Sequence, residues 1–508
     1  MGETTRREPG LVGAAAQITA ARTVQMAVVF ALTIPLTRIL TKPEYGVYAH
    51  ATFLASVLPL FVSAAAGKAV VYFLPRALRP ERVLRGVAAA QLLAMVVVGG
   101  AIALFPGTLR LLDAEDPLLV DHRVLIGLVV GASFPYTCAE QVMLARGARR
   151  GFAKLLLAVS TALLVGVGGA LWIAPADRVL AWALTGLLVA TSVQSVAAFA
   201  WMLLPFRPEP GTVRRHVGLR QALGFALPVA GAAGIGLLAA RIDGFWVPLF
   251  FSEVKGEYFR GAMEPPVIGA VAFTLLSLIA PDLSRHHAGD DVGKVLYLWR
   301  RTCRLVAVLT IPIVGAVEAV APDLFLWVYP DFGNGVPVFR WYTALMIVRI
   351  FLPQVLMENT GAARRTLLVT GVNLALVVWL TVGLTALAGW QGAAAAVMLA
   401  TLVANWAVGG ELVRRHLGVR WSDLMDWPAL LRLSAASVAA WMAVEIVMTR
   451  AAFADWGHFV RAATGTLVFA AAFAVAAPLA GAVTRADLAG LRRVFAPRLR
   501  ALAARVGL

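Results

Sequence analysis

The sequence predicts an all-helical membrane protein that crosses the bilayer many times. Of its 508 residues, 60% are hydrophobic and only 14% are charged, and the mean hydropathy is +0.80. Soluble domains are usually only about 45 to 50% apolar. Apolar runs of about 20 residues recur along the chain, the length that a helix needs to cross a bilayer. The runs lack the alternation of barrel strands, so helices are the spanning structure that satisfies the backbone.

Fourteen apolar runs can be distinguished, separated by polar or Pro/Gly-rich breaks. Because fourteen is even, both termini are expected on one side of the membrane. The predicted spans are 14–37, 47–74, 86–109, 123–145, 155–174, 179–204, 221–250, 262–283, 303–321, 336–358, 366–388, 390–412, 429–449 and 460–481.

The basic residues predict which side that is. Of the 45 Lys and Arg residues, 31 lie on the side of the termini, 10 on the opposite side and four within spans. Basic residues concentrate in cytoplasmic loops, so both termini are expected in the cytoplasm and the protein in the cytoplasmic (inner) membrane. The same asymmetry explains the net charge of +17 without a nucleic-acid partner. The outer loop that contains Asp113, Asp116 and Asp121 is acidic, as this topology requires.

A polar segment after the first span is repeated later in the chain. Gly256 and Tyr258 fall 210 positions after Gly46 and Tyr48, and each pair follows one long apolar run and precedes another. The segment 105–112, after the third span, has a similar counterpart at 321–328, after the ninth. Spans one to six and seven to twelve are therefore expected to be two copies in the same orientation. Such repeats form two lobes with a substrate site between them. We interpret segments 38–48 and 251–259 as equivalent outer starts of a second helix, a structural landmark and not a ligand site.

These observations divide the chain into six regions. The last is interpreted as an amphipathic helix on the anionic inner leaflet, because apolar residues recur at spacings of three and four among arginines. The regions are a cytoplasmic tail (1–13), the N-lobe (14–204), a cytoplasmic linker (205–220), the C-lobe (221–412), two additional spans (413–481) and a basic amphipathic tail (482–508).

Several spaced motifs resemble one family. Thr37-Arg-Ile-Leu40 followed by Pro43-Glu-Tyr-Gly-Val-Tyr48 resembles the signature after the first helix of Wzx-like polysaccharide and oligosaccharide flippases, which belong to the multidrug/oligosaccharidyl-lipid/polysaccharide (MOP) exporter superfamily. Further points that fit the family pattern are Asp243, Gly256, Tyr258, Ala280-Pro-Asp-Leu-Ser284 and Gly389-Trp-Gln-Gly-Ala-Ala394. The similarity covers residues 14–412. Fourteen spans look more like the lipid II flippase and sporulation-type branches than the twelve-span O-antigen flippases.

The resemblance implies a function. It predicts a flippase that moves a polyprenyl-diphosphate-linked oligosaccharide from the inner to the outer leaflet by alternating access, for polysaccharide export or cell-envelope biosynthesis. Its partners would be the lipid-linked glycan, membrane lipids and, as a further option, other polysaccharide-assembly membrane proteins. No enzymatic activity and no cofactor are expected.

Cations inside the spans are the candidate substrate-binding residues. A diphosphate needs a wet, cationic cavity, and a charge at the bilayer centre costs at least about 2.5 to 3.5 kcal/mol, so deep charges indicate function. Arg349 is the deepest, and a structural ion pair is its alternative role. Arg241 lies in span seven and Arg22 about 12 Å into span one, near the limit of snorkelling. We assign these three arginines to the cavity.

Three acids within spans are candidates for cation coupling or for pairing. Asp243 lies two residues after Arg241, so the two project from different helix faces and cannot simply neutralise each other. A packing or registry role is its alternative. Glu140 and Glu318 lie near span ends, where solvated or paired carboxylates are the alternative to proton coupling.

Two other classes of function remain to be compared with a flippase. A cation-coupled multidrug antiporter on the same fold would need central buried acids and a less basic cavity. A membrane-embedded glycan ligase or polymerase would need a large external loop, and the predicted outer loops are short. No GxxxxGK[ST] phosphate loop occurs. His286 and His287 lie in a charged loop without companion ligands, so no metal site is predicted there.

Overall fold

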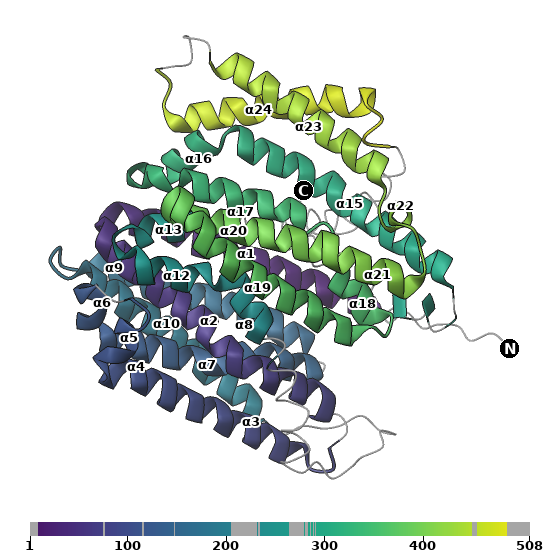
Figure 1. Ribbon diagram of the computed structural model, residues 1–508. Helices are drawn as coiled ribbons and strands as arrows, with labels where there is room; N and C mark the ends of the chain where they lie inside the picture. The colour runs from purple at the N-terminus through teal and green to yellow at the C-terminus, as the bar shows by residue number, and fades with distance from the viewer. Residues whose placement is uncertain are drawn as a thin grey trace. The chain divides into compact units, whose positions relative to one another are not determined.

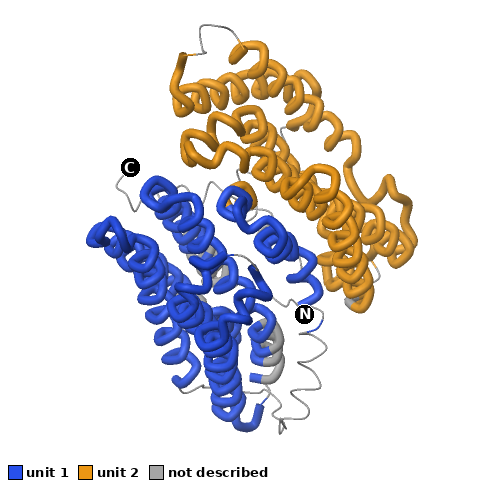
Figure 2. The backbone as a smooth tube through the Cα atoms, turned by 60° about the vertical axis from the view of Figure 1, so that its left-hand side comes forward, with its two compact units in different colours: residues 1–259 blue, residues 260–508 orange. Residues whose placement is uncertain are grey.

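Every regular element in the described part of the chain is a helix (Figure 1). The computed structural model describes residues 9–74, 77–113, 116–146, 148–204, 231, 234–263, 279, 283–284, 286–287, 289, 291–449 and 455–484. The chain forms two compact units, Met1–Phe259 and Arg260–Leu508, coloured separately in Figure 2. The expected linker (205–220) and residues 485–508 of the expected tail lie outside the described residues, as does most of the expected span 262–283.

Nine helical segments of the described residues are long and apolar enough to cross a membrane, which makes this a polytopic membrane protein. The longest, Arg364–Leu417, contains two helices that pack against each other on either side of Gly389, whose φ is 63°. The other segments are Lys42–Ser63, Pro80–Leu104, Gly151–Ile173, Val179–Leu203, Val292–Ala319, Pro330–Asn359, Trp427–Met448 and His458–Leu479.

In the first unit, α7 forms the centre of a helix bundle. It packs against α2 on one side and α10 on another, while α1 packs against α8. The helices of this unit are α1 (Pro9–Ile39), α2 (Lys42–Phe73), α3 (Pro80–Ala94), α4 (Gly100–Leu104), α5 (Pro106–Arg110), α6 (Pro117–Asp121), α7 (Arg123–Ala145), α8 (Arg149–Leu163), α9 (Gly169–Ile173), α10 (Val179–Leu203) and α12 (Asp243–Phe250). The helix α13 (Lys255–Gly261) begins in this unit and ends just beyond it.

In the second unit, α15 packs against both α17 and α23. Buried aromatic side chains, among them Trp299 and Phe351, fill its interior. The helices are α15 (Val292–Ala319), α16 (Ala321–Val328), α17 (Val336–Val348), α18 (Pro353–Asn359), α19 (Ala363–Ala388), α20 (Gly392–Leu402), α21 (Gly410–Leu417), α22 (Trp421–Leu424), α23 (Trp427–Met448) and α24 (His458–Leu479).

Three long helices each contain a π-helical turn that ends at a Gly-Gly pair. The turns are Met95–Gly99, Leu164–Gly168 and Val403–Gly409, and each is followed directly by another glycine. Around the first two turns, glycines let helix backbones approach closely. A Cβ on Gly99 would lie 2.7 Å from the Gly127 carbonyl oxygen on α7. Small residues at such contacts are typical of helix packing in membranes, where tight approach replaces the hydrophobic effect.

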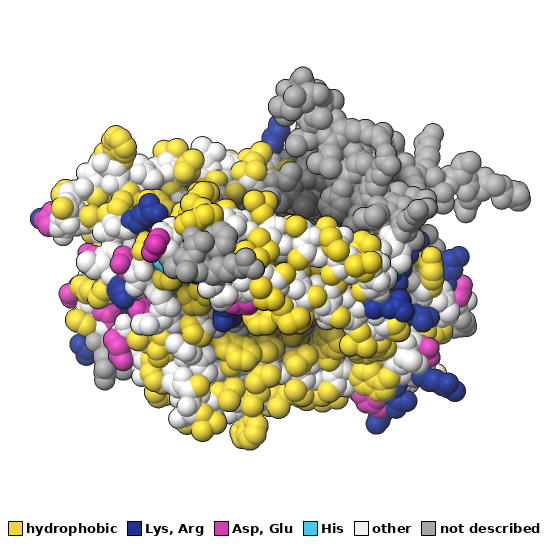
Figure 3. Space-filling view, turned by 90° about the horizontal axis from the view of Figure 1, so that it is seen from above, with side chains coloured by type: hydrophobic (Ala, Val, Ile, Leu, Met, Phe, Trp, Pro, Cys, Tyr) yellow, Lys and Arg dark blue, Asp and Glu magenta, His cyan; other side chains and the backbone are white. Residues whose placement is uncertain are grey.

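The face drawn in Figure 3 carries hydrophobic side chains across its middle, and most charged side chains lie towards its margins. Such an apolar band between polar margins is the surface that a bilayer covers. Large side chains on the helix surfaces agree with this, since Leu431 on α23 and Leu467 on α24 are about 70% exposed.

A substitution at one glycine contact tests this packing. In Gly186→Leu, the Cβ of the new side chain would clash with the carbonyl oxygen of Gly166. We therefore expect the free energy of unfolding to fall by about 1 to 3 kcal/mol. The control, Gly383→Leu on α19, adds the same side chain where nothing lies within 4 Å. Thermal unfolding in detergent should show a lower midpoint for Gly186→Leu alone, and equal midpoints would contradict the close approach.

Candidate functional site

Arg22 forms an ion pair in the first unit. Its guanidinium group, on α1, donates to the carboxylate of Glu140 on α7. Both side chains remain partly exposed, at 43% and 34%. One turn after Arg22 on α1 and one turn before Glu140 on α7, Gln25 Nε2 donates to the hydroxyl of Tyr136 over 3.4 Å. The structure thus brings together one predicted cation and one predicted acid, and the pair keeps access to a ligand.

Asp243 and Arg241 have different surroundings. Asp243 begins α12 and is buried, and its carboxylate accepts a hydrogen bond from the hydroxyl of Tyr258 on α13. Arg241 is only half-buried. Tyr258 is the tyrosine of the second repeat motif and is itself fully buried. The bond therefore fastens that motif to the helix before it.

Arg349 lies where a helix breaks. The expected span 336–358 is interrupted, because α17 ends at Val348 and α18 begins at Pro353. Proline cannot donate a backbone hydrogen bond, and it disfavours helical geometry in the residue before it. Where α17 ends, the carbonyl of Val348 accepts a hydrogen bond from the indole Nε1 of Trp406 over 3.0 Å. Arg349, half-buried, caps the C-terminus of α17, where the helix dipole favours a cation.

Glu318 lies close to the end of α15. Its carboxylate is 3.8 Å from Nε of Arg340 on α17, and the two side chains are 27% and 44% exposed. At that exposure the pair contributes at most about 1 kcal/mol to stability. Arg22 and Arg241 belong to the first compact unit, whereas Glu318 and Arg349 belong to the second.

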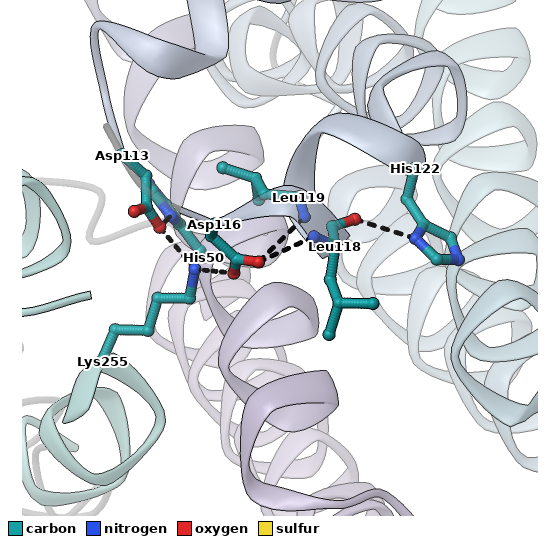
Figure 4. A network of polar contacts seen from close by, with 7 residues as sticks. All are labelled: His50, Asp113, Asp116, Leu118, Leu119, His122 and Lys255. Carbon is teal, nitrogen blue, oxygen red and sulfur yellow. Dashed lines mark hydrogen bonds and ion pairs between the residues drawn. The ribbon is translucent and has the colours of Figure 1, made fainter. Parts of the chain in front are cut away.

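Three further charged side chains and a histidine form a buried cluster that the sequence did not predict. Nζ of Lys255, on α13, donates to the carboxylates of both Asp113 and Asp116 (Figure 4). The side chains of Lys255 and Asp113 are 3% and 0% exposed. Nδ1 of His50, on α2, lies 3.6 Å from Oδ2 of Asp113, and this ring is also fully buried. We call these four residues the Lys255 cluster.

Local structure positions the acids of the Lys255 cluster. Asp113 follows the short helix α5, and its backbone N–H bonds the carbonyl of Leu109 over 2.8 Å. Asp116 is the N-cap of α6, where one carboxylate oxygen accepts from the N–H groups of Leu118 and Leu119 (Figure 4). Its other oxygen is thereby left to accept from Lys255.

The two motifs contact each other beside this cluster, at Gly46 and Gly256. A Cβ on Gly46 would lie 3.1 Å from Cγ of Lys255, and a Cβ on Gly256 would lie 2.9 Å from the carbonyl oxygen of Lys42. Lys42 also donates to Glu257 over 3.0 Å at the rim of the contact. Glycine therefore recurs in both motifs because the two backbones touch there.

The start of α2 explains much of the first motif. Glu44 accepts from the backbone N–H of Thr41 over 2.9 Å and from its hydroxyl over 2.7 Å, and Pro43 lies in the first turn. Tyr45 and Tyr48 are buried. These residues begin the helix and pack it, in keeping with the interpretation of the motif as a landmark.

The second unit contains a contact that is equivalent by the repeat. Arg260 lies 210 positions after His50, the spacing between the two motifs. Tyr329 lies 216 positions after Asp113, the spacing between segments 105–112 and 321–328. The guanidinium carbon of Arg260 lies 5.1 Å from the centroid of the Tyr329 ring. Each motif thus places a basic residue, two positions after its tyrosine, against a residue that lies one to three positions beyond a short helix.

The charges in these contacts shift the ionisation of their groups. Burial alone would raise the pKa of Asp113, but the His50 ring and the Lys255 ammonium group overcome it and lower the pKa to about 2. Burial lowers the pKa of Arg260 to about 10, partly opposed by Tyr329. Asp113 is thus an anion at neutral pH, which the buried ammonium group of Lys255 requires.

A metal site in the described ranges would need several ligand side chains close together. No group of three or more His, Cys, Asp or Glu side chains there could hold a metal ion. The Lys255 cluster has its own cation, and the two buried cysteines, Cys138 and Cys303, are not disulfide-bonded. The chemistry available is the binding and pairing of charge.

The sequence held part of the signal for the Lys255 cluster. Asp113 and Asp116 were recognised as an acidic outer loop, and Lys255 lies in the second motif on the same expected side. Opposite charges on one side of the membrane were a hint that they meet. Nothing distinguished His50, a single histidine in an apolar helix.

Comparisons with known proteins identify the kind of fold and a family. Residues 35–331 match the family described as "Polysaccharide biosynthesis protein". Among curated protein sequences, none matches this chain. The structure is similar to the lipid II flippase MurJ in an inward closed conformation, with a TM-score of 0.64 and 12% identity over 91% of this chain and 98% of that one.

Two further solved structures share the fold. One is an inward-facing multidrug resistance MATE family transporter of the MOP superfamily, with a TM-score of 0.60 and 13% identity over 79% of this chain and 98% of that one. The other is a MOP superfamily transporter from Pyrococcus furiosus, with a TM-score of 0.52 and 13% identity over 80% and 96%. At these identities the likeness establishes the fold.

Removing the buried ammonium group should destabilise the protein strongly. In Lys255→Met, two carboxylates lose their cation, and we expect the free energy of unfolding to fall by about 3 to 5 kcal/mol. The control Lys42→Gln removes a lysine whose side chain is 49% exposed, and should cost at most about 1 kcal/mol. Thermal unfolding in detergent measures both. The triple variant Lys255→Met, Asp113→Asn, Asp116→Asn should recover much of the loss; no recovery would mean that packing, not charge, holds the cluster.

Acid should weaken the same cluster in a defined range. The pKa of Asp113 is about 2 in the folded protein and about 3.9 in an unfolded chain, so its stabilising effect is complete above about pH 4 and disappears as the pH falls towards 2. The unfolding midpoint should therefore fall over this range, and less so in Asp113→Asn. The control Asp177→Asn changes a carboxylate that is 72% exposed and should leave the wild-type profile intact. Parallel profiles for wild type and Asp113→Asn would refute the assignment.

Proposed function

The chain belongs to the polysaccharide biosynthesis protein family, and on that premise we propose that it is a flippase for a lipid-linked oligosaccharide. The observation that carries the proposal is the family match over residues 35–331, more than half of the chain. The fold is that of known transporters, one of which is a lipid II flippase. The protein would move a polyprenyl-diphosphate glycan from the inner to the outer leaflet by alternating access, as part of polysaccharide export or cell-envelope biosynthesis.

The proposed topology has fourteen spans in the cytoplasmic (inner) membrane. Both termini lie on the cytoplasmic side. The distribution of Lys and Arg, 31 against 10, supports this orientation. Two lobes (14–204 and 221–412) and two additional spans (413–481) are proposed on the strength of the repeated motifs. In this topology the Lys255 cluster faces the outer side.

Substrate binding is assigned to Arg22, Arg241 and Arg349. All three are partly accessible, unlike Lys255, whose charge is already committed to two carboxylates. A diphosphate could take the place of the Glu140 carboxylate on Arg22. The helix break at Arg349 leaves non-helical backbone next to a charged side chain at membrane depth. Non-helical backbone is tolerated at that depth where it is buried in protein or lines a water-filled cavity.

The alternative is a cation-coupled multidrug antiporter, which the shared MATE fold makes relevant. The acids that would carry the coupling have partners. Asp243 is bonded by Tyr258, Glu140 by Arg22, and Glu318 lies near Arg340. Among the residues described, paired acids beside several arginines favour an anionic substrate. The proteins with the same fold are transporters, and we propose transport without a catalysed bond change, with the membrane and the lipid-linked glycan as the partners.

Flipping by purified protein in liposomes tests the proposal. A fluorescent polyprenyl-diphosphate oligosaccharide in the inner leaflet is protected from a quencher added outside the liposomes. Wild-type protein should move it to the outer leaflet, where the quencher reaches it. In Arg241→Gln, Arg349→Gln, two charge-assisted contacts to the diphosphate are lost, so we expect flipping at least about tenfold slower. The matched control Arg110→Gln, Arg178→Gln removes two exposed loop arginines and should flip normally.

The same liposomes separate the two functions. Cation-driven drug uptake without movement of the labelled lipid would favour the antiporter. Normal flipping by the double variant at equal reconstitution would refute the site assignment while leaving the flippase intact.

A further inference from the structure

A basic pocket opens at one end of the second unit, where α15, α22 and α23 meet. Its volume is about 570 Å³, within the range of small-molecule sites. The residues that line it are Tyr297, Arg300, Arg301, Arg304, Leu305, Ser422, Met425, Asp426, Pro428 and Thr484. Neither the predicted substrate-binding arginines nor the Lys255 cluster contributes to it.

The pocket carries an excess of positive charge. Three of its side chains are arginines from about one turn of α15, and Asp426 is the acid among the lining residues. Nη1 of Arg304 donates to Oδ2 of Asp426 over 2.6 Å, which neutralises one guanidinium group. Nη1 of Arg301 donates to the hydroxyl of Tyr297 over 3.3 Å, a neutral partner. Arg300 has no ion-pair partner among the described residues, so two positive charges remain for a ligand.

The pocket lies at the boundary between polar and apolar surface. The apolar stretch of α15 begins directly after Arg304, at Leu305. On α23, the acid Asp426 caps the helix and bonds the N–H of Ala429 over 3.2 Å. Beyond it, the large apolar side chains exposed on that helix are Leu431, Val438, Trp441, Met442 and Ile446. Arg432, Ser434 and Glu445 are also exposed there. Guanidinium groups thus lie at headgroup depth, next to a helix face suited to hydrocarbon.

We propose that this pocket binds the phosphate headgroup of an anionic phospholipid of the bilayer, with the acyl chains lying along α23. Basic pockets between membrane helices at the cytoplasmic side are typical sites for such headgroups. Arg300 and Arg301 are adjacent on α15, and both line the pocket. Two uncompensated guanidinium groups match a lipid with two phosphates, diphosphatidylglycerol, better than one with a single phosphate. The proposal is independent of the flippase assignment, because neither the ligand nor the residues are those of the transport site.

Native mass spectrometry of the full-length protein in detergent tests the proposal. Diphosphatidylglycerol is titrated, and the bound fraction gives an apparent affinity. In Arg300→Gln, Arg301→Gln we expect the affinity to fall about fivefold for each charge removed. The matched control Lys294→Gln, Arg364→Gln removes two cations of the same unit that do not line the pocket, and should bind normally. Equal unfolding midpoints ensure that folded proteins are compared.

A third variant should act in the opposite direction. Asp426→Asn removes the acid that lines the pocket, while asparagine can still cap α23, so binding should tighten about fivefold. Opposite effects of Asp426→Asn and the arginine variant would support the pocket. Equal loss in the pocket and control variants would overturn it, because the effect would then be one of net charge.

Two other ligands are separated by the same measurement. Preference for polyprenyl phosphate over diphosphatidylglycerol would overturn the phospholipid assignment in favour of the carrier lipid. Displacement of the phospholipid by millimolar inorganic phosphate would also overturn it, since a lipid anchored by its chains should outcompete the free anion. Normal flipping by the Arg300→Gln, Arg301→Gln variant would leave the proposal standing and set this pocket apart from transport.

Discussion

The ammonium group of Lys255 is buried away from solvent in a chain of which only 14% of the residues are charged. Burying such an ion costs several kcal/mol unless carboxylates and hydrogen bonds replace its water. Asp113 and Asp116 supply them, and each must then be held in place by its own short helix, α5 or α6. The need to satisfy one buried cation therefore constrains the placement of α5, α6 and the contact of α13 with α2.

The repeat gives that contact its geometry. Gly46 and Gly256 allow the two motif backbones to touch, and Tyr258 reaches back to Asp243. His50 and Arg260 occupy corresponding positions after the motif tyrosines, yet one faces a carboxylate and the other a phenol ring. The two motifs thus share the position of a basic side chain but differ in the partner that it contacts. The segments interpreted as structural landmarks thus take part in the buried polar contacts that hold α2 and α13 together.

Composition and hydrophobic patterning were sufficient for the all-helical class, because spanning segments must satisfy every backbone group internally. The motif near Tyr48 was sufficient for the family. Contacts between distant residues were not accessible in this way. Asp113 and Lys255 are 142 positions apart, and only folding brings them together. Pro353 lies within the predicted span 336–358, where a proline bends or kinks a helix, but the hydrogen bond from Trp406 to the carbonyl of Val348 at the break could not be predicted from the sequence. The pairing of Glu140 was one of two alternatives, but periodicity could not name Arg22 as the partner.

Exposure separates the charges of this protein into two chemical classes. The carboxylates around Lys255 are almost without solvent, so exchanging one for a ligand anion would require opening the packed contact between α2 and α13. Arg22 and Glu140 retain 43% and 34% of their exposure, so water already competes for the pair and its net strength is small. An incoming diphosphate brings two negative charges in place of one carboxylate and needs little rearrangement to displace it. The weak pairing of Arg22 is therefore compatible with its proposed role in binding an anionic substrate, whereas the sealed cluster is suited to holding the scaffold together.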